Sequence, residues 1–226
     1  MINIENTEVF GWEAAIRGMR NPMNSWDKSD SYDGCYIGEC NDCPQITWAG
    51  CHGFDSTFKI GENDLKLMQN LSKAGNDHGK FLRMINVTMD VTAPLYWWKE
   101  ADTYSVGKVQ NSCSTMHKIH AKKFTLDDFS HEHLLKEGFD SINSTIDTLN
   151  HYRNLFLETK HKTYWWQMIQ LLPSSYNQRR TVQLNYQVLK SMYHARKNHK
   201  LDCWVEFCKW IETLPYFKEL CIDVVD

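Results

Sequence analysis

The most constraining stretch of this sequence is a run of strict alternation between residues 84 and 92. Ile85, Val87, Met89 and Val91 are separated by the polar residues Asn86, Thr88, Asp90 and Thr92. A period of two places all the apolar side chains on one face of an extended chain, which is typical of a half-buried β-strand. Any fold of this chain must therefore bury one face of a sheet.

The segments around this strand carry helical patterns. Pro94 favours the first turn of a following helix, because its missing N–H is not needed there. Apolar spacing and terminal residues predict further helices at 8–20, 62–74 (capped near Asn63), 130–160, 163–171, Pro173 to about 197, and 201–213. Residues 25–60 and 103–123 are expected to be loops. Because no repeat or linker is visible, we predict one α+β domain over residues 1–226, with long helices packed on a small sheet.

Charge and composition argue against several classes of protein. A formal net charge of −3 gives no general attraction to nucleic acid or to an anionic membrane surface. No stretch is long and apolar enough to span a bilayer, and the N-terminus does not resemble a signal peptide. We therefore expect a cytoplasmic protein without membrane or nucleic-acid partners, in which the eight cysteines stay mostly reduced.

Four of those cysteines and one histidine fall in a cysteine-rich insertion at about 25–60. Cys40 and Cys43 form a Cys-x2-Cys pair, which is the usual tight half of a zinc site. Cys35 and either Cys51 or His52 would complete the tetrahedral set. Such a closed site has a structural role, because it leaves no position for water. Small buried thiols without a metal are the alternative interpretation.

An asparagine and an arginine near the C-terminus suggest a second candidate site. Asn185 and Arg196 are eleven residues apart, so on one continuous helix they return to within roughly 20° of the same face, about 16 Å apart. Leu189 and Met192 lie between them on that face. A largely buried guanidinium needs either an anionic ligand or an internal carboxylate. Both interpretations of Arg196 follow from this pattern.

These residues resemble the C-terminal half of the flavin-dependent thymidylate synthases. In that family a Leu-Pro turn precedes an Asn and, eleven residues later, a nucleotide-binding Arg, as in Leu172-Pro173, Asn185 and Arg196. Upstream motifs of the family are matched in the same order. Ala14, Ala15 and Arg17 correspond to its Ala-Ala-Arg, the segment 62–74 with His78 to its helix followed by a His, and 84–92 with Ala93-Pro94 to its strand and Ala-Pro. Lys99-Glu100 stands where the family has an Arg-Gln pair.

A diagnostic motif of the family is missing. Thr103, Tyr104 and Ser105 stand where the family has Arg-His-Arg, whose charges hold flavin phosphates and the nucleotide. A hydroxyl offers one neutral hydrogen bond, whereas a guanidinium offers a charged, bidentate contact. The loop that follows, QNSCST, is either the floor of a ligand pocket or a solvated turn. The cations available to compensate are Lys99, Lys108, Lys122, Lys123, Arg179 and Arg180.

The resemblance implies a homotetrameric enzyme that uses reduced FAD and a folate methylene donor to modify C5 of a deoxyuridine nucleotide. It assigns the nucleotide to Glu100, Asn111, Ser112, Cys113, Ser114, Thr115, Asn185 and Arg196, and the flavin to His78, Thr88, Thr103, Tyr104 and Ser105. Arg196 and Cys113 are the catalytic candidates, the latter only if a nearby cation stabilises its thiolate. The alternative is an altered homologue that binds a nucleotide or a protein partner without chemistry.

Overall fold

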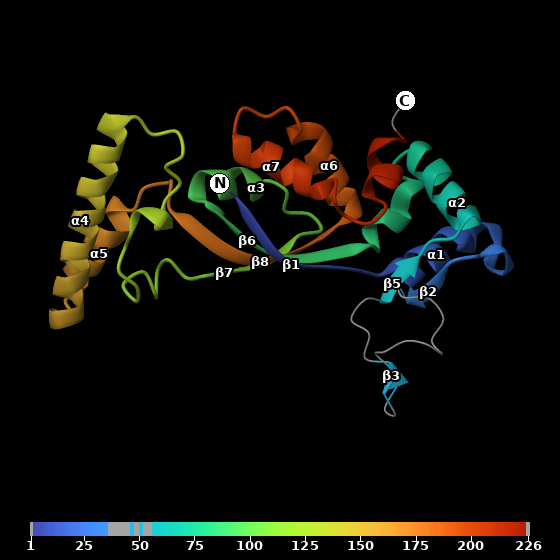
Figure 1. The fold of residues 1–226 in the computed structure, drawn as a ribbon, viewed down its shortest axis with the longest axis horizontal. Coiled ribbons are helices and arrows are strands. Elements are labelled where there is room, and N and C mark those ends of the chain that lie inside the picture. The colour runs from blue at the N-terminus through green and yellow to red at the C-terminus, as the bar shows by residue number, and fades with distance from the viewer. Residues whose placement is uncertain (1, 36–45, 48–49, 52–55, 225–226) are drawn as a thin grey trace. The chain divides into compact units, whose positions relative to one another are not determined.

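The computed structural model of the protein describes residues 2–35, 46–47, 50–51 and 56–224, and its elements are shown in Figure 1. The chain forms two compact units. The sheet unit comprises Met1–Val9, Val87–Leu184 and Ser191–Thr213, and the helical unit comprises Phe10–Asn86, Asn185–Lys190 and Leu214–Asp226. Each unit therefore combines segments that are distant in sequence. Within the described ranges, no helix has the length and apolarity needed to cross a membrane.

The sheet unit is built on four strands in the order β1-β6-β8-β7. The strand predicted at 84–92 is confirmed as β6, and its buried residues are Val87, Met89, Val91, Ala93 and Pro94. Strands β7 and β8 are antiparallel, with Val109 opposite Gln183. The bounds of the four strands are β1 Asn3–Phe10, β6 Asn86–Pro94, β7 Val109–Ser112 and β8 Asn177–Asn185.

Two helices cover the buried face of this sheet. Helix α3 (Leu95–Ala101) starts directly after Pro94, as predicted, and α7 spans Asp202–Ile211. The ring of Trp97 in α3 lies 4.8 Å from the ring of Trp204 and 5.4 Å from the ring of Phe207, both in α7. Burial of side chains of this size stabilises a fold by about 1.5–3 kcal/mol each. This aromatic layer holds the two helices on the strands.

Helices α4 (Lys136–Thr159) and α5 (Lys162–Leu171) lie side by side in the same unit (Figure 1). Their core contains the helically spaced residues Ile142, Ile146 and Leu149 together with Met168. Helix α4 starts six residues later than the sequence predicts, and it ends at Lys160, whose φ of 56° is left-handed. The helix predicted at 163–171 is confirmed as α5.

The helical unit packs three helices around aromatic residues. They are α1 (Trp12–Arg20), α2 (Glu62–Lys73) and the beginning of α6 (Tyr186–Arg196), and a π-helical turn follows at Lys218–Ile222. The ring of Trp12 meets that of Tyr186 edge-on at 5.5 Å, and the Tyr186 hydroxyl donates a 2.6 Å hydrogen bond to the carbonyl oxygen of Pro215. The segment expected to be a loop at 25–60 contains the paired strands β2 Tyr32–Cys35 and β5 Ser56–Lys59, and β3 Ile46–Thr47 and β4 Gly50–Cys51.

Helix α1 begins at Trp12 because of a single glycine. The sequence predicts a helix from residue 8, but residues 8–10 belong to β1. Gly11 follows them with φ of +96°, and a Cβ at this position would lie 2.2 Å from the carbonyl oxygen of Met84. Only glycine accepts both the left-handed backbone and the close approach.

A buried ion pair anchors the chain between α1 and β2. Arg20 Nε donates to Asp64 Oδ1 at 2.6 Å, and both side chains are almost fully buried. The other Asp64 oxygen accepts hydrogen bonds from Ser29 Oγ and Ser31 Oγ. Burial raises the pKa of the Asp64 carboxyl, but these hydrogen bonds and the Arg20 charge outweigh it, so the pKa is lowered.

The amino end of α2 is capped from outside the helix. The sequence predicts a cap near Asn63, but Asp30 Oδ2 and Oδ1 accept the backbone N–H groups of Asn63 and Asp64 at 2.9 and 3.1 Å. A carboxylate at this position also interacts favourably with the positive end of the helix dipole.

Candidate functional site

Asn185 ends a strand and caps the following helix. The sequence predicts one helix from Pro173 to about 197, and this is wrong for its first half, because β8 runs to Asn185 and α6 begins at Tyr186. Asn185 Oδ1 accepts the backbone N–H of Val188 at 3.0 Å, which is an N-cap interaction. Asn185 and Arg196 therefore do not share one helix face, and this prediction is wrong.

Arg196, in the last turn of α6, is paired with a carboxylate. Its Nη1 donates to Glu100 Oε2 at 2.8 Å, and its Nε donates to the Tyr104 hydroxyl at 3.1 Å. The guanidinium carbon lies 4.9 Å from the ring centre of Trp204, and 20% of the side chain is exposed. Of the two interpretations of Arg196, the internal carboxylate is confirmed.

Glu100 lies at the centre of a group of five side chains. We call this group the Glu100 cluster, and its members are Glu100, Tyr104, Arg196, His199 and Trp204. Besides Arg196, the Trp204 Nε1–H donates to Glu100 Oε2 at 3.0 Å, and His199 Nε2 lies 3.4 Å from the same oxygen. His199 Nδ1 accepts the N–H of Leu201, so Nε2 carries the proton in the neutral ring. Glu100 Oε1 accepts no hydrogen bond from the described part of the chain. One carboxylate oxygen is therefore crowded with donors while the other is open.

A second carboxylate organises the adjacent turn. Asp102 Oδ1 accepts from Gln110 Nε2 at 2.8 Å and from Lys108 Nζ and Arg180 Nη1, each at 3.0 Å. The Arg180 guanidinium stacks 4.1 Å above the ring of Trp98. Partial burial raises the pKa of the Asp102 carboxyl, but the three donors outweigh it, so the pKa is lowered. Lys108 and Arg180 are therefore both bound to Asp102, a carboxylate of the chain itself.

The loop predicted to form a pocket floor is partly an edge strand. Asn111 and Ser112 belong to β7, and the Cys113 N–H continues the ladder by donating to the carbonyl oxygen of Arg179 at 2.9 Å. Ser114 Oγ accepts the N–H of His117 at 2.9 Å and so closes a turn. The side chains of residues 111–114 are exposed, and Thr115 is half-buried.

The residues assigned to flavin by resemblance lie in three places. Thr103 Oγ1 donates to the Glu100 carbonyl oxygen at 2.7 Å, and Tyr104 is bound by Arg196. Ser105 is exposed beside them in sequence, whereas Thr88 lies on β6 and its hydroxyl donates to Glu8 Oε2 at 3.3 Å. His78 belongs to the helical unit, directly before a short 3₁₀ helix at Gly79–Arg83. Tyr104 is thus a member of the Glu100 cluster, and Thr103 bonds to the Glu100 backbone.

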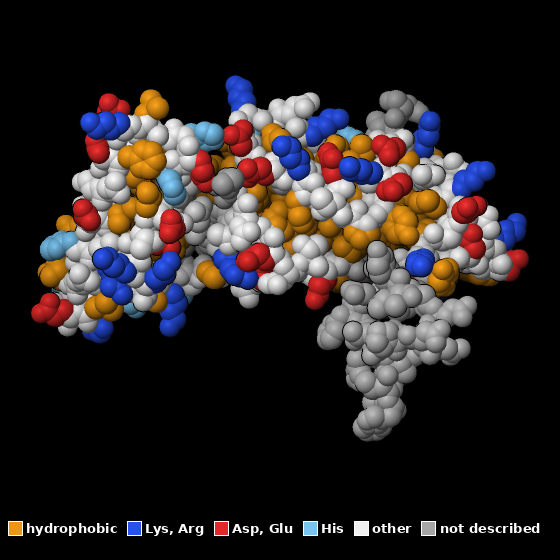
Figure 2. Space-filling view, viewed as in Figure 1, with side chains coloured by type: hydrophobic (Ala, Val, Ile, Leu, Met, Phe, Trp, Pro, Cys, Tyr) orange, Lys and Arg blue, Asp and Glu red, His pale blue; other side chains and the backbone are white. Residues whose placement is uncertain are grey.

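Most of the cations expected to compensate for the missing motif are also paired. Arg179 contacts Asp90 at 2.8 Å and Glu5 at 3.4 Å, and Lys122 contacts Asp128 at 2.8 Å. With Lys108 and Arg180, four of the six are bound to carboxylates of the chain. Acidic and basic side chains are accordingly interspersed on the face drawn in Figure 2.

The predicted zinc ligands fall outside the described residues. This applies to Cys40, Cys43 and His52 entirely, and to the side chains of Cys35 and Cys51. Among the residues that are described, no group of three or more His, Cys, Asp or Glu side chains is arranged to hold a metal ion. The zinc site therefore has no support in the described part of the chain.

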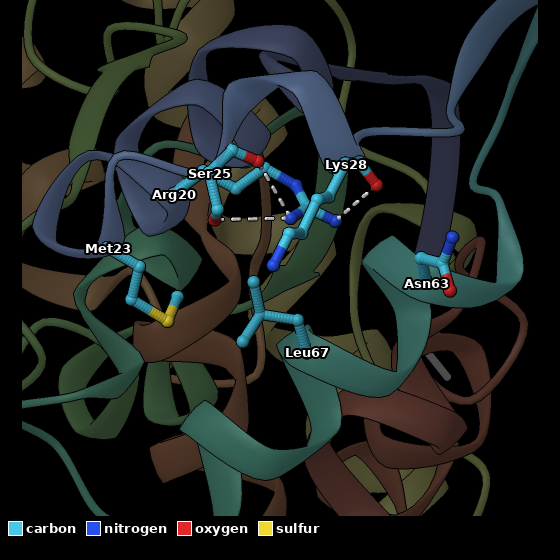
Figure 3. A pocket seen from close by; sticks show the side chains of 6 residues that line it. All are labelled: Arg20, Met23, Ser25, Lys28, Asn63 and Leu67. Atoms are coloured by element: carbon cyan, nitrogen blue, oxygen red, sulfur yellow. Dashed lines mark hydrogen bonds between the residues drawn. The ribbon is translucent and has the colours of Figure 1, made fainter.

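The helical unit contains a cavity of about 440 Å³, lined by Arg20, Met23, Ser25, Lys28, Asn63 and Leu67 (Figure 3). Arg20 Nη1 donates to the carbonyl oxygen and hydroxyl of Ser25 at 3.1 and 3.3 Å, and Nη2 donates to the Lys28 carbonyl oxygen at 3.0 Å. With its Nε on Asp64, this guanidinium holds the cavity wall together. It has a structural role here.

Two members of the site region carry no recognisable signal in the sequence. Asp102 looks like any exposed acidic residue after a helix, and Trp204 looks like any core aromatic of α7. Their roles depend on Arg180 and Glu100, which are 78 and 104 residues away in the chain. Contacts over such separations cannot be read from periodicity.

Comparisons with known proteins give the fold. No protein-family model matches the sequence, and no curated protein matches it. Two crystal structures of thymidylate synthase X from Helicobacter pylori, one described as flavin-dependent and both containing FAD and dUMP, align with 99% of this chain and with 99% and 100% of theirs. The sequence identity is 15% and the TM-score 0.64 in both cases. The chain therefore has the α+β fold of these flavin-dependent thymidylate synthase structures.

Proposed function

We propose that the protein binds a deoxyuridine-type pyrimidine, with the nucleotide dUMP as the reference case, at the Glu100 cluster and residues 111–115. The observation that carries the proposal is the contact of Glu100 and Arg196. The two residues are assigned to the nucleotide from separate motifs, and they meet at 2.8 Å across 96 residues of sequence. This meeting occurs in a fold whose relatives contain FAD and dUMP.

We further propose that the bound pyrimidine is modified at C5, by methylation or a related one-carbon transfer. Reduced FAD and a folate methylene donor would supply the reducing equivalents and the carbon. The contribution of this chain is to orient the pyrimidine. Arg196, Asn111 and the hydroxyls of Ser112, Ser114 and Thr115 offer neutral and charged donors to base and sugar oxygens. A homotetramer, as in the family, is part of this proposal.

The residues in the family's flavin position do not fit a flavin pyrophosphate. Two of the three hydroxyls are already engaged, Thr103 with the Glu100 carbonyl and Tyr104 with Arg196. The neighbouring cations Lys108 and Arg180 are both bound to the carboxylate of Asp102. A pyrophosphate needs unpaired guanidinium, ammonium or N–H donors. The C5 modification proposed above therefore requires a flavin that is held by groups other than these residues.

This misfit favours a second candidate function. An altered homologue would keep the pyrimidine site and lose the flavin, and would act as a binding protein without chemistry. The two functions share the Glu100 cluster and differ only in whether a flavin binds.

A flavin titration separates the two candidates. Purified protein is titrated with FAD while flavin fluorescence is followed, and its thermal unfolding is measured with and without dUMP. Saturable FAD binding together with stabilisation by dUMP supports the enzyme. Stabilisation by dUMP without FAD binding supports the binding protein. If neither FAD nor dUMP has an effect at millimolar concentration, the proposed pyrimidine site is wrong.

A further inference from the structure

We propose that Glu100 is a specificity residue that selects a pyrimidine nucleoside, without a terminal phosphate, over the corresponding nucleoside monophosphate. The inference rests on the pyrimidine site proposed above and specifies which form of the pyrimidine binds there. It is carried by the charges and hydrogen bonds around Glu100.

Three cations around this site are already bound to two carboxylates of the chain. Arg196 is paired with Glu100, and Lys108 and Arg180 are paired with Asp102. A phosphate monoester carries a charge of about −1.5 to −2 at neutral pH and is normally bound by unpaired cations. A phosphate bound to Arg196 would compete with Glu100 for the guanidinium and would lie beside the Glu100 carboxylate.

Glu100 itself offers a contact that suits an uncharged ligand. Oε2 is occupied by Arg196, Trp204 and His199, whereas Oε1 accepts nothing from the described residues and a third of the side chain is exposed. A carboxylate oxygen in this state is a strong acceptor for a sugar hydroxyl. A 2′-deoxynucleoside has a 5′-hydroxyl that can donate to this oxygen, whereas a 5′-monophosphate carries an anion at the same position.

The same carboxylate therefore attracts one ligand and repels the other. Like charges placed together at a binding site penalise the wrong partner even where every other contact is kept. The neighbouring residues Thr103, Tyr104 and Ser105 add no cation to this site.

The test is isothermal titration of the full chain with 2′-deoxyuridine and with dUMP, at neutral pH and low salt. Three proteins are compared: wild type, Glu100→Gln, and Glu158→Gln as the charge-matched control on the exposed last turn of α4. In the wild type and the control, dUMP is expected to bind no more tightly than deoxyuridine. In Glu100→Gln, dUMP is expected to gain about tenfold relative to deoxyuridine, because the repulsion is gone while the side-chain shape is kept.

Two results would overturn the inference while leaving the pyrimidine site intact. One is tighter binding of dUMP than of deoxyuridine by wild type, by about tenfold or more. The other is an unchanged dUMP to deoxyuridine ratio in Glu100→Gln. The wild-type ratio alone tests the proposal should the variant not fold. Absence of binding by both ligands to all three proteins would instead overturn the proposed pyrimidine site, and the inference with it.

Discussion

Glu100 and Arg196 form a 2.8 Å ion pair between the last turns of α3 and α6, and three further side chains converge on the pair. The guanidinium stacks on Trp204 and the carboxylate accepts from its indole N–H. The pair thus joins three helices of the sheet unit. Removing this ion pair is therefore expected to lower the stability of the fold, independently of any effect on ligand binding.

Replacing Arg196 with Met is expected to destabilise the protein by about 1–2 kcal/mol. The variant loses charged hydrogen bonds to Glu100 and Tyr104, but the side chains are partly exposed, so solvent compensates for part of the loss. Urea unfolding measures the effect. In the double variant Arg196→Met/Glu100→Gln, the loss should be smaller than the sum of the single losses, and strict additivity would contradict the coupling.

Replacing Arg20 with Met is expected to cost about 3–5 kcal/mol, because it leaves Asp64 buried without its cation. The matched control is Arg17→Met in the same helix. Arg17 pairs with Glu13 at 3.6 Å with both side chains about two-thirds exposed, so its loss should cost less than about 0.5 kcal/mol. Similar losses for Arg20→Met and Arg17→Met in urea unfolding would contradict the buried role of Arg20.

The lowered pKa of Asp64 predicts a loss of stability in acid. Its folded-state pKa lies below the ordinary value of 3.8, so the unfolded chain binds more protons in that range. The contribution of Asp64 is complete above about pH 5 and decreases as the pH falls through the folded pKa. Asp64→Asn should be less stable at neutral pH and should lose less stability between pH 5 and 3. The control is Asp27→Asn, at an exposed position, which should keep the wild-type pH profile.

Alanine substitutions at two glycines distinguish the energetic cost of a strained backbone from that of a steric clash. Gly75 has φ of +101°, and a Cβ added there would meet no other atom within 4 Å, so Gly75→Ala should cost only the left-handed strain, about 1–2 kcal/mol. Gly11 has a similar φ but faces the Met84 carbonyl oxygen, so Gly11→Ala should cost clearly more. Equal losses of unfolding free energy would contradict the close approach at Gly11.

Substitutions at Asn185 distinguish its role as a helix N-cap from a role in ligand binding. Asn185→Ala should destabilise by about 1 kcal/mol, whereas Asn185→Asp should restore most of the loss, because its carboxylate also accepts the Val188 N–H. Thermal unfolding reports the cap, and dUMP titration reports the ligand. A role in ligand binding requires that Asn185→Asp folds like wild type and still binds dUMP more weakly.

The central strand and the helices are predictable from the sequence because their burial is periodic. Strand β6 buries every second residue, and α2, α5 and α7 each present apolar residues at helical spacing. The edge strands β1 and β7 escape prediction for the converse reason. Most of their side chains are exposed, so no face is marked by apolar residues.

Strand β8 has the sequence pattern of a helix because its inward positions include polar residues. Gln178 is buried, its amide donates to the Cys113 carbonyl oxygen, and its own backbone carbonyl accepts the Trp98 indole N–H. Arg180 stacks on Trp98. Because Gln178 and Arg180 are polar, the sequence shows the alternation of buried and exposed residues in β8 only at Val182 and Leu184. Arg196 is a candidate both from its expected helical spacing and from the motif order of the family, whereas its partner Glu100 is a candidate only through the resemblance.

Binding of a pyrimidine at the Glu100 cluster can be measured by calorimetric titration. In this experiment 2′-deoxyuridine is titrated into wild type, Arg196→Ala and Arg17→Ala. Saturable binding is expected for wild type and for Arg17→Ala, which changes an exposed side chain of the helical unit. Arg196→Ala is expected to lose at least about tenfold in affinity. Equal affinity of folded Arg196→Ala and wild type would contradict binding at this cluster.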